Sequence, residues 1–166
     1  MILGMSVGVF TLVHVIITLV AIGSGLIVAG GMFASHSLPV TTALFLFATG
    51  LTSLTGFLFP IHDFTPALGV GILACAILLV ALFALYKEHL MGAWRWICVI
   101  AAVASLYLNV FVLVAQSFAK VSGLNALAPT QSESPFAITQ AVVLAIFILI
   151  AVIAVVEFRP NIAERA

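Results

Sequence analysis

The first charged side chain in this chain is Asp63, and every residue before it is uncharged. Apart from the polar segment ASHSLP at positions 34–39, that stretch is almost entirely apolar. Water does not solvate so long an apolar segment, whereas lipid tails accept apolar side chains at no cost. A transmembrane helix needs about 20 such residues. The chain is therefore expected to begin with two membrane-spanning helices.

The composition extends this conclusion to the whole chain. Of its 166 residues, 65% are hydrophobic and 6% are charged, whereas soluble domains carry roughly 25% charged residues. We therefore expect an all-α integral membrane helical bundle, whose first partner is the lipid bilayer. Other membrane subunits or a second copy of the chain are further candidate partners. The formal net charge is zero and no basic block exists, so nucleic-acid binding has no electrostatic basis.

Charged residues and prolines divide the chain into five apolar spans, which we assign to one domain, residues 1–166. Pro39, Pro60, Pro66 and Pro135 fall at or beside the proposed helix ends, where a missing N–H costs least. The first span lacks a positive n-region and exceeds a signal-peptide core of roughly 7–15 residues, so we interpret it as a retained helix. The predicted spans are about 7–33, 40–59, 66–86, 94–118 and 136–156.

The positive-inside rule orients this predicted bundle. One side holds the greater number of basic residues, which are Lys87, Arg95, Arg159 and Arg165, and the opposite side holds Lys120. Cytoplasmic loops carry the excess of Lys and Arg. We therefore expect a multi-pass protein of the inner (plasma) membrane, with the N-terminus outside and the C-terminus in the cytoplasm.

Polar side chains within four of the spans fall at one depth, in the half predicted to be outer. The connection IHDFT lies above them, between the second and third spans. Polar groups in a span are costly unless they are paired, so this gathering indicates a polar pocket that opens outward. Helix–helix hydrogen bonding explains the Thr and Ser residues better, and the other intramembrane residues about as well. The predicted ligand-binding residues are His14, Thr18, Thr52, His62, Asp63, Asn109, Gln116 and Gln140, and no metal ligand is predicted.

Two pairs of small residues predict close contacts between helices. Ala21 with Gly25, and Ala67 with Gly71, have the small-xxx-small spacing that lets helix backbones approach one another. The spacing does not distinguish packing within one chain from oligomerisation.

Several segments resemble blocks of a known family. They are TGFLFPIHDFTPALGVG, GAWRW, LYLNVFVLVAQSFAKV and ALAPTQSESPF. Together they resemble a family of small uncharacterised bacterial multi-span membrane proteins. The resemblance covers most of the chain and implies a bacterial membrane protein, but it transfers no activity and no catalytic residue.

Two functional hypotheses follow. In the first, the protein is an accessory subunit of a larger membrane complex, or it binds a small lipid-like molecule such as a quinone, without a cofactor. In the alternative, it is a b-type haem electron-transfer protein with His14 and His62 as axial ligands, because histidines from different elements usually hold haem iron in a bundle.

Other classes have less support in the sequence. A metal site formed by His14, His62 and Asp63 lacks the helical ligand spacing that would favour it. The charged residues lie at helix ends, which disfavours a proton-coupled transporter or an ion channel. No catalytic residue is predicted, because the chain contains no G-x-S-x-G, H-E-x-x-H or P-loop motif. Intramembrane enzymes can lack such motifs, so an enzyme is disfavoured but not excluded.

Overall fold

The protein is an all-α membrane bundle, as predicted. The computed structural model describes residues 1–59 and 66–160, and these residues contain helices and no β-strand. Five of the helices are long and apolar enough to cross a membrane. The elements are α1 (Val7–Phe33), α2 (Pro39–Phe57), α3 (Pro66–Leu82), the π-helical turn η1 (Phe83–Lys87), α4 (Trp94–Lys120), α5 (Ser122–Leu127) and α6 (Ser134–Glu157).

Prolines and one capping serine mark the starts of four helices. Pro39 and Pro66 are the first residues of α2 and α3, and Pro135 is the second residue of α6. Proline suits these positions because its φ is already helical and its missing N–H would have no intrahelical partner. At the start of α1, the hydroxyl of Ser6 accepts a hydrogen bond from the backbone N–H of Val9 at 3.3 Å, which is an N-cap.

The third span ends in a wider turn than the sequence indicates. The predicted helix over 66–86 is α-helical only to Leu82 and continues as the π-helical turn η1. After η1, His89 and Leu90 have positive φ values of 50° and 58°. The N–H of Leu90 donates to the carbonyl of Ala84 at 3.1 Å, which holds this reversal in place. Left-handed conformations cost of order 1–3 kcal/mol each in residues other than glycine.

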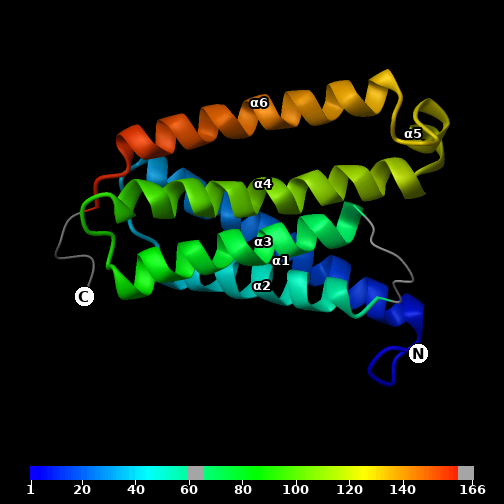
Figure 1. Ribbon diagram of the computed structural model, residues 1–166, viewed down its shortest axis with the longest axis horizontal. Coiled ribbons are helices and arrows are strands. Elements are labelled where there is room, and N and C mark those ends of the chain that lie inside the picture. The colour runs from blue at the N-terminus through cyan, green and yellow to red at the C-terminus, as the bar shows by residue number, and fades with distance from the viewer. Residues whose placement is uncertain (60–65, 161–166) are drawn as a thin grey trace.

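Successive long helices run in opposite directions, so the connections gather at two ends (Figure 1). We call one the N-terminal end; it holds the start of α1, the end of α2 and the short helix α5. The other is the C-terminal end, which holds segments 34–38, 88–93 and 158–160. The C-terminal end is the side that the distribution of basic residues predicts to be cytoplasmic.

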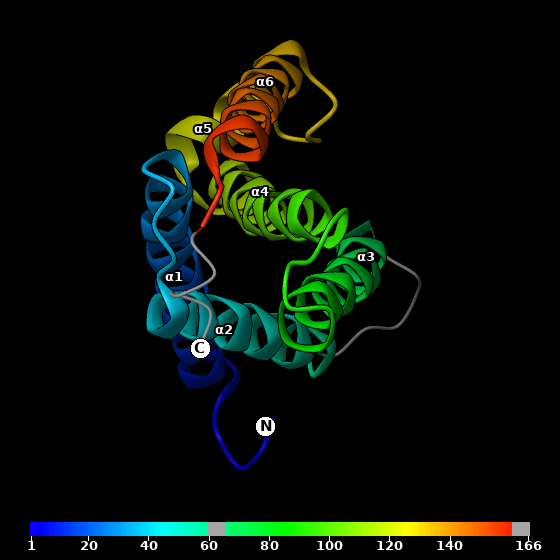
Figure 2. The ribbon, with the colours of Figure 1, turned by 90° about the vertical axis from the view of Figure 1, so that its left-hand side faces the viewer.

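Helix α4 is the centre of the bundle. It packs against α1, α2, α3 and α6, and its buried residues include Val99 and Leu106, which are 0% and 1% exposed. Seen along the helices, α1 to α4 surround a common core, and α6 packs against α4 and α1 at one side of it (Figure 2). The lipid-facing surface is formed by exposed apolar side chains on all five long helices.

Candidate functional site

His14 of α1 contacts α2 near the N-terminal end. Its Nδ1 atom lies 2.8 Å from Oγ1 of Thr55, and the Thr55 hydroxyl donates to the carbonyl of Leu51 at 2.6 Å. A hydroxyl has one proton, so Nδ1–H of His14 is the donor to Thr55. The ring also packs edge-on against Phe59, with centroids 5.4 Å apart.

Thr18 and Thr52 form a second polar contact between α1 and α2, one helical turn farther from the N-terminal end. The Thr18 hydroxyl donates to the carbonyl of His14 at 2.9 Å, and Oγ1 of Thr52 lies 3.4 Å from Oγ1 of Thr18. Since the proton of Thr18 is already used, Thr52 is the donor in the second contact. These polar groups therefore join α1 to α2.

Asn109 and Gln140 join two further helix pairs. Nδ2 of Asn109 donates to Oγ1 of Thr49 on α2 at 3.1 Å. Nε2 of Gln140 on α6 donates to the carbonyl of Phe111 on α4 at 3.1 Å, while its Oε1 is buried without a partner among the described residues. Gln116 is exposed. The described members of the predicted set, other than Gln116, thus make contacts at three helix interfaces.

Two predicted site residues, His62 and Asp63, lie outside the described residues. The pocket predicted beneath them, and the haem hypothesis that pairs His62 with His14, therefore stay predictions. Among residues 1–59 and 66–160, no group of three or more His, Cys, Asp or Glu side chains is placed to hold a metal ion.

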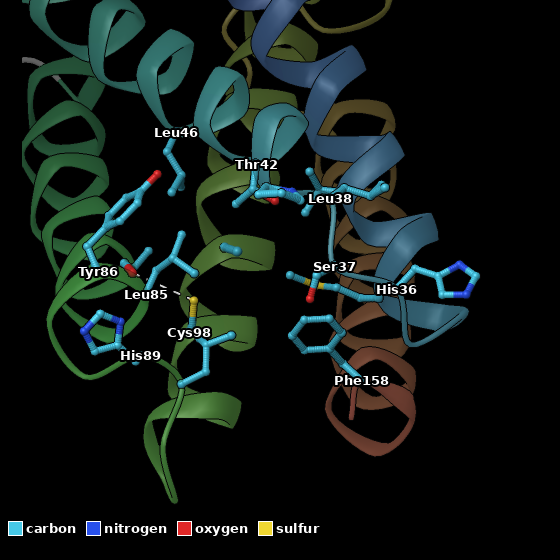
Figure 3. A pocket seen from close by; sticks show the side chains of 16 residues that line it. His36, Ser37, Leu38, Thr42, Leu46, Leu85, Tyr86, His89, Cys98 and Phe158 are labelled. Atoms are coloured by element: carbon cyan, nitrogen blue, oxygen red, sulfur yellow. Dashed lines mark hydrogen bonds between the residues drawn. The ribbon is translucent and has the colours of Figure 1, made fainter. Parts of the chain in front are cut away.

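A cavity of about 300 Å³ opens at the C-terminal end of the bundle (Figure 3). Its inner wall consists of apolar residues one to two helical turns inside the ends, including Val28, Leu46, Ala81 and Ala102. The helices α1, α2, α3 and α4 each contribute one of these four residues. None of the six predicted binding residues that the structure describes lines this cavity. We call it the C-terminal cavity.

The mouth of the C-terminal cavity is polar. Ser37 and Thr42 lie on the side formed by the α1–α2 connection and the start of α2. Their hydroxyls make no hydrogen bond within the described part of the chain, whereas Thr11 and Thr139 each bond the carbonyl four residues earlier. In Figure 3 the ring of His36 points away from the cavity. The polar side chains of the lining are His36, Ser37, Thr42, Tyr86 and His89, together with the thiol of Cys98.

Phe158 closes the C-terminal cavity on the side of α6. It follows the last helical residue, is 6% exposed and lines the cavity. Nη1 of Arg95 donates to the carbonyls of Phe158 and Val155 at 2.6 and 3.0 Å. Such carbonyls at a helix end have no intrahelical partner. The N–H of Arg159 also donates to Oγ of Ser35 at 2.8 Å, which ties this segment to the α1–α2 connection.

Polar residues in two connections of the sequence pointed to this end of the bundle, although the prediction did not use them. His36 and Ser37 lie in the first connection, and Tyr86 and His89 lie in or beside the third. Alternating helix direction places both connections at one end of the bundle. The sequence therefore places two polar connections at the C-terminal end of the bundle. The distance between them depends on how the helices pack.

No protein-family model, curated protein or solved structure matches the chain. The resemblance to a bacterial membrane-protein family stays a prediction.

Proposed function

We propose that this integral membrane protein binds a small lipid-like molecule in the C-terminal cavity. The observation that carries the proposal is a space of about 300 Å³ with an apolar inner wall and a polar mouth. Ligand sites commonly combine apolar lining with a few polar groups and have volumes of roughly 300–1,000 Å³. The class of ligand is the one that the sequence predicted, but this site lies at the other end of the bundle from His14.

The size and position of the cavity restrict the ligand further. At the lower limit of the usual volume range, the cavity has room for one apolar chain or one ring. The inner wall reaches only from the helix ends to Val28, Leu46, Ala81 and Ala102. An amphiphile would place its apolar part against this wall and keep its polar group at the mouth, where the membrane interface supplies water.

Mass spectrometry under native conditions tests this function. The protein is extracted from its own membrane with a mild detergent, and the intact mass is compared with the 17.4 kDa of the bare chain. We expect one small molecule bound to each chain. Val28→Phe should remove it, because Val28 is 4% exposed and the larger side chain would fill the cavity. The matched control is Val20→Phe on the same helix, where the side chain is 42% exposed to lipid.

Two results would contradict the proposal. One is an unmodified mass for the wild-type chain, and the other is a bound molecule that Val28→Phe leaves in place. The same spectrum distinguishes the predicted accessory-subunit role, because a partner would add the mass of a second polypeptide rather than that of a small molecule.

A further inference from the structure

Several helix-end carbonyls at the C-terminal end of the bundle accept hydrogen bonds within the protein. The last turn of α1 offers its carbonyls to the N–H groups that follow: Gly31 accepts from His36 at 2.8 Å, and Met32 accepts from Ser35 at 3.1 Å. In α6, the carbonyl of Phe158 accepts from Arg95 at 2.6 Å. These three carbonyls are therefore already satisfied and are not free to bind a donor on a ligand at the mouth of the C-terminal cavity.

Donors at the same mouth remain available. The start of α2 has no side-chain cap, because its N-cap residue is Leu38, and Leu38 itself lines the cavity. The hydroxyls of Ser37 and Thr42 line it too and have no partner among the described residues. A polar group that accepts hydrogen bonds would satisfy these donors.

The charges nearby favour an anion. Arg95 donates to two neutral carbonyls, and it has no carboxylate partner in residues 1–59 and 66–160. Its guanidinium binds the backbone carbonyl of Phe158, a residue of the cavity wall, although Arg95 itself does not line the cavity. The two described acids at this end, Glu88 and Glu157, do not line the cavity. A positive charge that no described carboxylate offsets raises the local electrostatic potential at this end of the bundle.

We infer that the ligand of the C-terminal cavity is a fatty acid, bound with its chain against the apolar wall and its carboxylate at the mouth. This inference rests on the proposed function and narrows it. The carboxylate would accept hydrogen bonds from Thr42 and Ser37 and would lie in the field of Arg95. A cationic amphiphile would meet no acid in the lining.

Competition binding tests the inference. Radiolabelled decanoate is bound to the protein in lipid nanodiscs, at a pH well above the ordinary pKa of a carboxylic acid. Unlabelled decanoate, decanol and decyltrimethylammonium then compete for the site. Nanodiscs that contain the Val28→Phe protein measure partition into the lipid. We expect decanoate to bind about tenfold more tightly than decanol, as one favourable charge interaction provides, and decyltrimethylammonium to bind most weakly.

The charge of Arg95 is tested with a pair of variants. Arg95→Gln and Arg95→Lys both disrupt the contacts with α6, so any loss of packing should weaken decanoate and decanol alike. The readout is therefore the ratio of the two Kd values. We expect the preference for decanoate to disappear in Arg95→Gln and to persist in Arg95→Lys. Lys120→Gln, which removes a cation at the N-terminal end, should leave the ratio unchanged.

The outcomes separate this inference from the proposed function. Decanol that binds as tightly as decanoate, or decyltrimethylammonium that binds more tightly, would overturn the fatty-acid assignment and leave a lipid-binding cavity. An equal ratio of Kd values in Arg95→Gln and the wild type would overturn the role of the guanidinium. No saturable binding of any of the three probes would overturn the inference and the proposed function together.

Discussion

Asn109 of α4 donates from Nδ2 to Oγ1 of Thr49 on α2 at 3.1 Å, in the buried interior of the bundle. Thr49 is 0% exposed and Asn109 is 6% exposed. Lipid offers neither group an alternative partner. The sequence identified Asn109 as a candidate ligand-binding residue, and the structure gives it a helix–helix contact.

We predict that Asn109→Ala destabilises the folded protein by about 0.6–2 kcal/mol, the range of hydrogen bonds between membrane helices. Unfolding in mixed micelles of detergent and lipid would measure the change. Gln116→Ala is the control, because Gln116 lies on the same helix but is exposed. Equal losses from the two variants would show that the bond to Thr49 contributes nothing.

Gly25 of α1 lies close to side chains of both α2 and α4. A Cβ atom at this position would lie 2.7 Å from Cδ1 of Leu106 and 2.9 Å from Cδ2 of Phe45. Both neighbours are 1% exposed and cannot move away freely. We therefore predict that Gly25→Ala costs roughly 1–3 kcal/mol of stability, as overpacking of a core does. Gly23→Ala should cost little, because no atom lies within 4 Å of a Cβ there. A thermal shift equal for both variants would contradict this prediction.

Arg95 stabilises the end of α6. Arg95→Met keeps an apolar stem but leaves the carbonyls of Val155 and Phe158 without their donor. We predict a loss of about 1.5–3 kcal/mol, the range for hydrogen bonds to charged groups, together with faster hydrogen exchange in the last turn of α6. Arg159→Met provides the control, since Arg159 uses its backbone N–H to bind Ser35. A protected end of α6 in the Arg95→Met protein would be evidence against this role.

The carboxylate of Glu133 binds two residues of the connection before α6. Its carboxylate accepts from the hydroxyl of Thr130 at 2.8 Å and from the backbone N–H of Ser132 at 3.1 Å. The side-chain hydrogen bond from Thr130 is the largest cause that holds the pKa of Glu133 below its ordinary value. A lowered folded-state pKa means that the stabilisation is present above the unfolded-state pKa and is lost as the pH falls through the folded-state pKa.

We therefore predict that hydrogen exchange in segment 130–134 accelerates as the pH falls through the folded-state pKa of Glu133. Thr130→Val should raise that pKa toward its ordinary value and move the transition to higher pH. Glu133→Gln should abolish the transition, because the amide does not titrate. A transition that persists in Glu133→Gln would assign it to another group.

The spans could be predicted because lipid imposes a length on apolar helices and proline marks their starts. Val7–Phe33 agrees with the predicted first span, and Pro39 and Pro66 begin α2 and α3. The π-helical turn η1 could not be predicted, since FALYK has no local feature that sets it apart from an α-helical segment. The short helix α5 was also missed. Its sequence, SGLNAL, reads as a connection, and a bond from Asn125 to the carbonyl of Phe118 at 3.2 Å holds it against α4.

The candidate site was less predictable than the fold. Periodicity showed that His14 and Thr18 share a helix face, and both do contact α2. Periodicity does not show which faces leave a space between them. The C-terminal cavity depends on the turn at His89 and Leu90 and on the position of Phe158, which Arg95 fixes from a distant part of the chain. These are tertiary relationships, and no local pattern in the sequence encodes them.

The hydrogen bond between Ser35 and Arg159 also has a consequence for how the protein is made. It joins the first connection of the chain to the segment after the last helix, so it forms only after the ribosome has synthesised α6. Until then the C-terminal cavity lacks the wall that Phe158 provides. Completion of the C-terminal cavity is therefore a late step of biogenesis, which follows the synthesis of the last helix.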